Sequence, residues 1–139
     1  MTKKQILALV VSSPGSLQNG LLALITTIPQ ISSVLVAEEV DAALRMVENH
    51  QPALIIMDVS LPKVQDVIKQ VKAQYTQVHL IILADDIAQQ KEIEAFDVDS
   101  VLLKGFSAQK LIEILENVLS RQEYTPPVQA NGKGGMNAN

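Results

Sequence analysis

The chain has 139 residues, enough for one domain but short for two. It carries 11 Lys and Arg against 15 Asp and Glu, a formal net charge of -4, and no basic cluster of the kind that binds a phosphate backbone. We therefore expect no direct contact with nucleic acid. Cysteine is absent, which excludes disulfides, zinc ribbons, iron–sulfur sites and thiol catalysis.

The N-terminus resembles a secretory signal only superficially. Lys3 and Lys4 precede an apolar run at Ile6–Val11, but that run is shorter than the roughly 7 to 15 residues of a signal core. No apolar stretch approaches the roughly 18 residues that cross a bilayer. We expect a soluble, cytoplasmic protein without membrane contact.

Short, continuous apolar runs recur along the chain and predict strands that are covered on both faces. They lie at 6–11, 34–37, 53–57, 78–83 and 100–103. Segments with helical spacing follow them, at 17–28, 40–47, 66–74, 87–96 and 107–119. Ser16 and Ser107 are predicted N-caps, and Ile87 is a predicted apolar anchor of the fourth helix. The alternation predicts parallel strands joined by helical crossovers, a three-layer α/β fold.

The composition changes near the C-terminus. Residues 1–120 form the predicted domain, whereas Pro, Gly and Asn dominate from Arg121 onward. Such a segment has too few large apolar side chains to pack into a core. We predict that residues 121–139 are a disordered tail or a linker to a further domain.

Reactive groups collect where parallel strands end, so the residues after each run are the candidates for chemistry. They are Ser12, Ser13, Asp58, Ala84, Asp85, Asp86, Lys104 and Gly105. Asp58 directly follows a buried strand, which suits a carboxylate nucleophile. Lys104 ends the last strand in the same way, which suits an ammonium that neutralises a bound anion.

At these residues the chain resembles the receiver domains of two-component response regulators. The resemblance covers about residues 3 to 120 and rests on LIIMDVSLP at 54–62 and VLLKGF at 101–106. It implies a flavodoxin-like fold, a doubly wound parallel sheet of strand order 2-1-3-4-5. It also implies that Asp58 accepts a phosphoryl group from a histidine kinase and that Lys104 contacts that group.

The chain departs from the family pattern at several positions. Ser12 and Ser13 stand where receivers usually place the acidic pair that holds Mg²⁺, a cation that prefers anionic oxygens. Asp58 and Lys104 then remain, and their charges cancel. Ala84 replaces the switch Thr or Ser, and Leu102 replaces the switch aromatic. We expect no cofactor, and Mg²⁺ only if phosphorylation is retained.

Structural roles compete with the functional ones. Lys104 is equally explained as a structural ion-pair partner of Asp58, and Ser12 and Ser13 as residues that turn the chain and cap the first helix. Asp85 and Asp86 are weak candidates for holding a cation with Asp58. For Asp86 the alternative is helix capping.

The leading hypothesis is a degenerate receiver that acts through protein contacts. Its predicted partners are a histidine kinase, an output protein, or a second copy bound through the fourth helix, fifth strand and fifth helix. The first alternative is a phospho-accepting receiver with an unusual Mg²⁺ site. The second is a flavodoxin-like carrier of phosphate or nucleotide, suggested by the hydroxyl-rich segment 12–16. No Ser, His and Asp set converges at the strand ends, so we expect no enzymatic activity.

Overall fold

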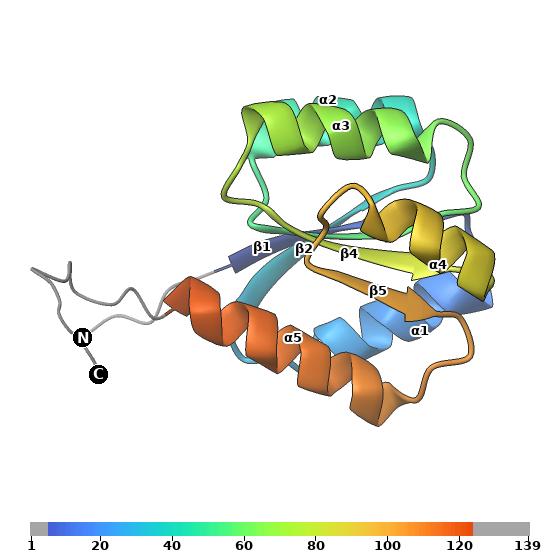
Figure 1. Ribbon diagram of the computed structural model, residues 1–139. Helices are drawn as coiled ribbons and strands as arrows, with labels where there is room; N and C mark the ends of the chain where they lie inside the picture. Colours follow the sequence, from blue (N-terminus) through green and yellow to red (C-terminus); the bar gives the residue numbers. More distant parts are fainter. Residues whose placement is uncertain (1–5, 124–139) are drawn as a thin grey trace, which may run out of the picture.

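The computed structural model describes the backbone of residues 6–123 and the side chains of residues 6–120. Strands and helices alternate along the chain (Figure 1). The strands are β1 (Ile6–Val11), β2 (Ile31–Ala37), β3 (Leu54–Asp58), β4 (His79–Ala84) and β5 (Ser100–Leu103). The helices are α1 (Ser16–Ile25), α2 (Val40–His50), α3 (Val64–Gln74), α4 (Ile87–Glu94) and α5 (Ala108–Glu123).

The strands form one parallel sheet in the order β2-β1-β3-β4-β5. Helices lie on both sides of the sheet, with α2 and α3 on one side and α1 and α5 on the other (Figure 1). The predicted three-layer α/β fold and its strand order are therefore confirmed. Because all strands run in the same direction, their C-terminal ends meet at one edge of the sheet.

Two apolar clusters hold the three layers together. Neighbouring residues of a strand point to opposite faces, so Leu9 and Ile55 belong to one cluster, whereas Ala8 and Ile56 belong to the other. Buried side chains of α2, α3 and α4 complete the first cluster, and those of α1 and α5 complete the second. The central strands are thus covered on both faces, as their continuous apolar runs indicate.

Element boundaries differ from the predicted ones where polar residues enter a strand. β2 begins at Ile31, three residues before the predicted start, because Ile31 and Ser33 pair with Ile6 and Leu7 of β1, with Ser32 at an irregularity of the ladder between them. Both serines are exposed on this edge strand, where a polar side chain is tolerated. β3 and β4 each begin and end one residue later than predicted. α3 begins at Val64, two residues earlier.

Two of the predicted helix features are wrong. Gly15, not Ser16, is the N-cap of α1, and its φ of 145° is a conformation that favours glycine. The anchor expected at Ile87 is 60% exposed, and Ile93 alone of that helix is buried. Capping by Ser107 is confirmed, since its Oγ accepts a hydrogen bond from Lys110 N at 3.1 Å.

The C-terminal helix extends past the expected end of the domain. α5 continues to Glu123, three residues beyond residue 120. The predicted tail lies, from residue 124 onward, outside the described residues. No helix within residues 6–123 combines the length and the apolar character needed to cross a bilayer.

Ile93 and Ile87 provide a matched test of what holds α4 in place. Ile93→Ala should lower the free energy of unfolding by about 2–5 kcal/mol, because it empties a fully buried site. Ile87→Ala should change it by less than about 0.5 kcal/mol, because most of this side chain is in water. Urea denaturation followed by circular dichroism measures both. Equal losses for the two variants would contradict the proposed difference in burial.

Candidate functional site

Asp58 and Lys104 meet at the C-terminal edge of the sheet. Asp58 is the last residue of β3, and Lys104 follows β5 directly. Lys104 N donates to Ala84 O at 2.8 Å, so the ladder between β4 and β5 continues to the residue that carries the ammonium. Gly105 then turns the chain with a φ of 92°, a conformation that a side chain would strain. This turn fixes where the Lys104 side chain begins.

The buried carboxylate of Asp58 is held through one of its oxygens. Oδ1 accepts hydrogen bonds from Ser60 N at 2.9 Å and from Ser60 Oγ at 2.7 Å. Lys104 Nζ lies 2.6 Å from the same oxygen. In the described part of the chain, Oδ2 takes no hydrogen bond. Oδ2 is therefore the oxygen that could attack an electrophile.

Lys104 also reaches a second carboxylate. Its Nζ lies 2.7 Å from Asp85 Oδ1, so one ammonium bridges the ends of β3 and β4. The expectation that Asp58 and Lys104 stand alone with cancelling charges is wrong. Two carboxylates and one ammonium leave a local charge of -1. Asp86 does not join them, because its Oδ1 accepts a hydrogen bond from Gln89 N at 2.9 Å and caps α4.

This arrangement stabilises the charged forms of Asp58 and Lys104. Burial alone would raise the pKa of Asp58, but the hydrogen bonds from Lys104 and Ser60 outweigh it, and the pKa falls below its ordinary value. Burial alone would lower the pKa of Lys104, but its bonds to Asp58 and Asp85 raise the pKa above its ordinary value. The ion pair therefore persists across the whole neutral range.

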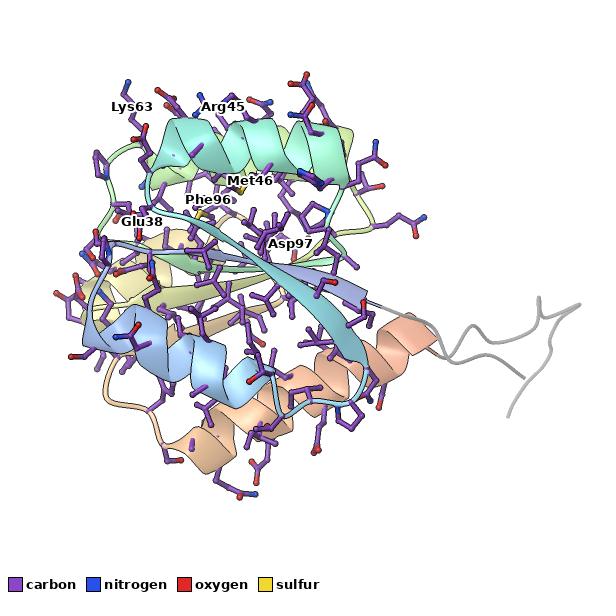
Figure 2. All side chains as sticks on the ribbon, turned by 180° about the vertical axis from the view of Figure 1, so that it is seen from behind. Glu38, Arg45, Met46, Lys63, Phe96 and Asp97 are labelled. Atoms are coloured by element: carbon purple, nitrogen blue, oxygen red, sulfur yellow. The ribbon has the colours of Figure 1, made fainter. Side chains whose placement is uncertain are left out.

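Serines and a glutamine, not an acidic pair, follow the end of β1. Ser12 is fully buried, and its Oγ donates to Ser13 O at 3.3 Å. Gln18 Nε2 donates to Ser12 O at 3.1 Å and to Glu38 Oε2 at 3.3 Å. The interpretation of Ser12 and Ser13 as caps of α1 is wrong, because no side chain caps that helix. Glu38 lies at the side of the molecule where β1 ends (Figure 2).

These residues do not fit Mg²⁺. A magnesium ion requires several oxygen ligands, preferably anionic, in a near-octahedral arrangement. Here the Gln18 amide presents N–H groups at the end of β1, and the Lys104 ammonium lies against both nearby carboxylates. Among the described residues, no group of three or more Asp, Glu, His or Cys side chains is placed to hold a metal ion.

The two substituted switch positions are core residues. Ala84 is fully buried and Leu102 is 5% exposed. Ala84 has no hydroxyl to bind a phosphoryl oxygen. Leu102 packs in the cluster beneath α1 and α5. Neither side chain can report the state of Asp58 by a new hydrogen bond.

Sequence reasoning missed Ser60 and Gln18. Ser60 comes two residues after Asp58, a spacing at which Asp side chains commonly bind the backbone, and that spacing was a usable signal. Gln18 lies three residues before Leu21 and seven before Ile25, on the buried face of α1. A polar residue on such a face indicates a buried hydrogen bond.

The family match agrees with this geometry. The model of the response regulator receiver domain matches residues 9–116, most of the chain. The chain belongs to the receiver domain family. Receivers are domains of two-component signalling. This assignment therefore replaces the alternative in which the chain is a flavodoxin-like carrier of phosphate or nucleotide.

Relatives of this receiver include longer regulators. The transcriptional regulatory protein DegU of Brevibacillus brevis is 24% identical over 131 residues, which cover 91% of this chain and 56% of DegU. This receiver therefore spans little more than half the length of that regulator.

Solved structures share the fold. The isolated receiver domain of RcsB from Salmonella enterica serovar Typhimurium, solved with phosphomimetic BeF3-, has a TM-score of 0.76 at 17% identity and covers 88% of this chain and 94% of its own. The receiver of an HD domain-containing protein from Pseudomonas fluorescens Pf-5 has a TM-score of 0.74 at 22% identity, with coverages of 86% and 98%.

The lowered pKa of Asp58 predicts a pH-dependent stability. Unfolded, this carboxyl has an ordinary pKa of 3.8, so the stabilisation by its charged form is complete above that pH and is lost as pH falls through the lower native pKa. Urea unfolding should therefore show a difference in the free energy of unfolding between the wild type and Asp58→Asn. That difference should be constant near neutral pH and should diminish below about pH 4. A difference that stays constant in acid would contradict the ion pair.

Proposed function

We propose that this receiver signals through protein contacts and that phosphorylation of Asp58 is lost or strongly reduced. One observation carries the proposal: the Lys104 ammonium bridges Asp58 and Asp85 at 2.6 and 2.7 Å. Its charge is already neutralised by these carboxylates. It is therefore poorly placed to stabilise the negative charge of an incoming phosphoryl group.

Electrostatics at the strand ends support the same conclusion. The local charge of -1 repels a phosphoryl donor, which is itself an anion. In the family a bound Mg²⁺ offsets this repulsion, but Ser12 and Ser13 stand at the positions of the acidic pair that would hold it. Asp58 is also 7% exposed, so little of it is open to a donor from solvent.

The α4–β5–α5 face is the proposed contact surface. It has a shallow hollow of about 360 Å³, lined by Gln90 of α4, residues 101–106 and Lys110 of α5. Ile87 lies one turn before Gln90 on α4 and is 60% exposed. An apolar side chain next to a hollow suits a protein partner, either a kinase, an output protein or a second copy.

One alternative within the same family has a specific observation in its favour. Asp58 and Asp85 converge on a single nitrogen, so a divalent cation that displaced Lys104 would find two carboxylates. That receiver would accept a phosphoryl group with Mg²⁺ held by these two side chains, and it therefore requires Lys104 to leave the position in which the structure shows it and in which the site does not fit Mg²⁺. Labelling with a small phosphoryl donor separates it from the first proposal.

Incubation with Mg²⁺ and acetyl phosphate tests the chemistry of Asp58. We expect no hydroxylamine-labile phosphoryl group on the intact protein by mass spectrometry, because hydroxylamine cleaves an acyl phosphate and Asp58 should form none. An ordinary receiver labelled in parallel shows that the conditions suffice. A labile phosphoryl group that is absent from Asp58→Asn would support the alternative and overturn the proposal.

Light scattering tests the version in which a second copy binds the α4–β5–α5 face. Ile87→Lys should lower the dimer fraction, because it places a charge where an apolar side chain meets its partner. Asn19→Lys adds the same charge to an exposed position of α1 and should leave the dimer unchanged. A wild type that stays monomeric at high concentration would rule this version out.

A further inference from the structure

The outer edge of β2 is an open strand edge. β2 stands at the end of the strand order and pairs with β1 alone. It crosses the front of the molecule between α1 and α2 in Figure 2, and no other helix or strand of residues 6–123 lies in front of it. Ser12 N donates to Ala37 O at 3.0 Å, so the backbone groups of Ala37 face β1. Because successive residues of a strand turn their N–H and C=O groups to opposite sides, those of Val34 and Val36 face the open edge.

The other edge of the sheet is protected in ways that β2 is not. Proteins blunt exposed edges with short strands and with charged side chains. β5 has 4 residues and lies between Asp99 and Lys104. β2 has 7 residues, more than the other described strands, and contains neither a charged residue nor proline. The irregularity of its ladder at Ser32 leaves residues 33–37 in regular pairing with β1.

Charge is absent from the part of the chain that builds this edge. Residues 5–37, which include β1, α1 and β2, hold none of the 11 Lys and Arg and none of the 15 Asp and Glu. The whole chain has a net charge of -4, so two copies of it repel each other at long range. An uncharged edge lets two copies approach without placing like charges in contact.

We propose that two copies of this chain pair through β2, antiparallel about a two-fold axis at Leu35. In this register Val34 of each copy lies opposite Val36 of the other, and each such pair exchanges its outward N–H and C=O groups. Leu35 meets its own equivalent on the face of the sheet that α2 covers. The inference goes beyond the proposed function, because it uses the edge opposite the α4–β5–α5 face and does not depend on the state of Asp58.

The side chains suit this register. Val34 and Val36 are half-buried, and β-branched residues form favourable pairs across antiparallel strands. Glu38, the first charged residue after β2, lies opposite Ser32 of the second copy, so no like charges meet. The register also keeps the pairing within residues 33–37, the regular part of the strand.

Cysteine cross-linking tests the register, because the chain has no cysteine of its own. Leu35→Cys places two thiols opposite each other at the axis, where Cα atoms about 4.5 Å apart permit a disulfide. Ser33→Cys is the matched control, since its two Cα atoms would lie about 13 Å apart along the paired strands. Mild oxidation should link Leu35→Cys at least about tenfold faster than Ser33→Cys. Random collision would favour the control, because Ser33 is the more exposed.

Sedimentation and light scattering test the hydrogen bonds. Val36→Pro removes an N–H group at the open edge and leaves the ladder with β1 intact. It should raise the dissociation constant of the dimer by about tenfold or more, because the symmetric pair loses the same bond twice. Ile87→Lys should leave this dimer unchanged, since α4 contacts β4 and β5 at the other side of the sheet. Circular dichroism confirms that each variant is folded.

Each outcome supports or overturns the pairing through β2. A wild type that stays monomeric at high concentration overturns it and leaves the edge to a strand of a different protein. Equal cross-linking of Leu35→Cys and Ser33→Cys also overturns it. A dimer that persists in folded Val36→Pro but is lost in Ile87→Lys overturns it in favour of the α4–β5–α5 face. If Val36→Pro does not fold, the cross-linking comparison decides alone.

Discussion

The ammonium of Lys104 holds the C-terminal ends of three neighbouring strands together. It lies beyond β5 and pairs with Asp58 of β3 and with Asp85, which follows β4. Because burial opposes the charges of Asp58 and Lys104, each of these two groups depends on its charged partners. Three features follow from this one bridge. They are the position of Ser60, the ionised state of Asp58 and the poor fit of the site to a divalent cation.

The sheet fixes the positions of the residues that form this bridge. Its central strands are packed on both faces by aliphatic side chains, so their ends cannot shift without disturbing two cores. The backbone ladder continues one residue past β5 to Lys104. A rigid scaffold with a long side chain at its edge is a common way to place one ammonium among several acceptors.

Much of the fold could be predicted because its signals are local. The apolar runs located all the strands, and serine or aspartate at the start of α5 and α4 predicted caps that the structure has. Predictions failed where the signal was not local. Ser33 is a strand residue because it pairs with Leu7 of β1, and Ile87 is exposed although its apolar side chain indicated an anchor. Of the candidate site, Asp58 and Lys104 were found by their places after strands, whereas Ser60 and Gln18 were not considered.

The sequence by itself determined the type of fold, the family and the residues at the strand ends, since alternating strands and helices, Asp58 and Lys104 are all readable along the chain. Only the tertiary structure decided which of those residues touch. Asp58, Asp85 and Lys104 are separated by 27 and 19 positions, so their meeting depends on the strand order and on the reach of one side chain. Contacts between the ends of strands depend on the strand order and on side-chain rotamers, which residues far apart along the chain decide together.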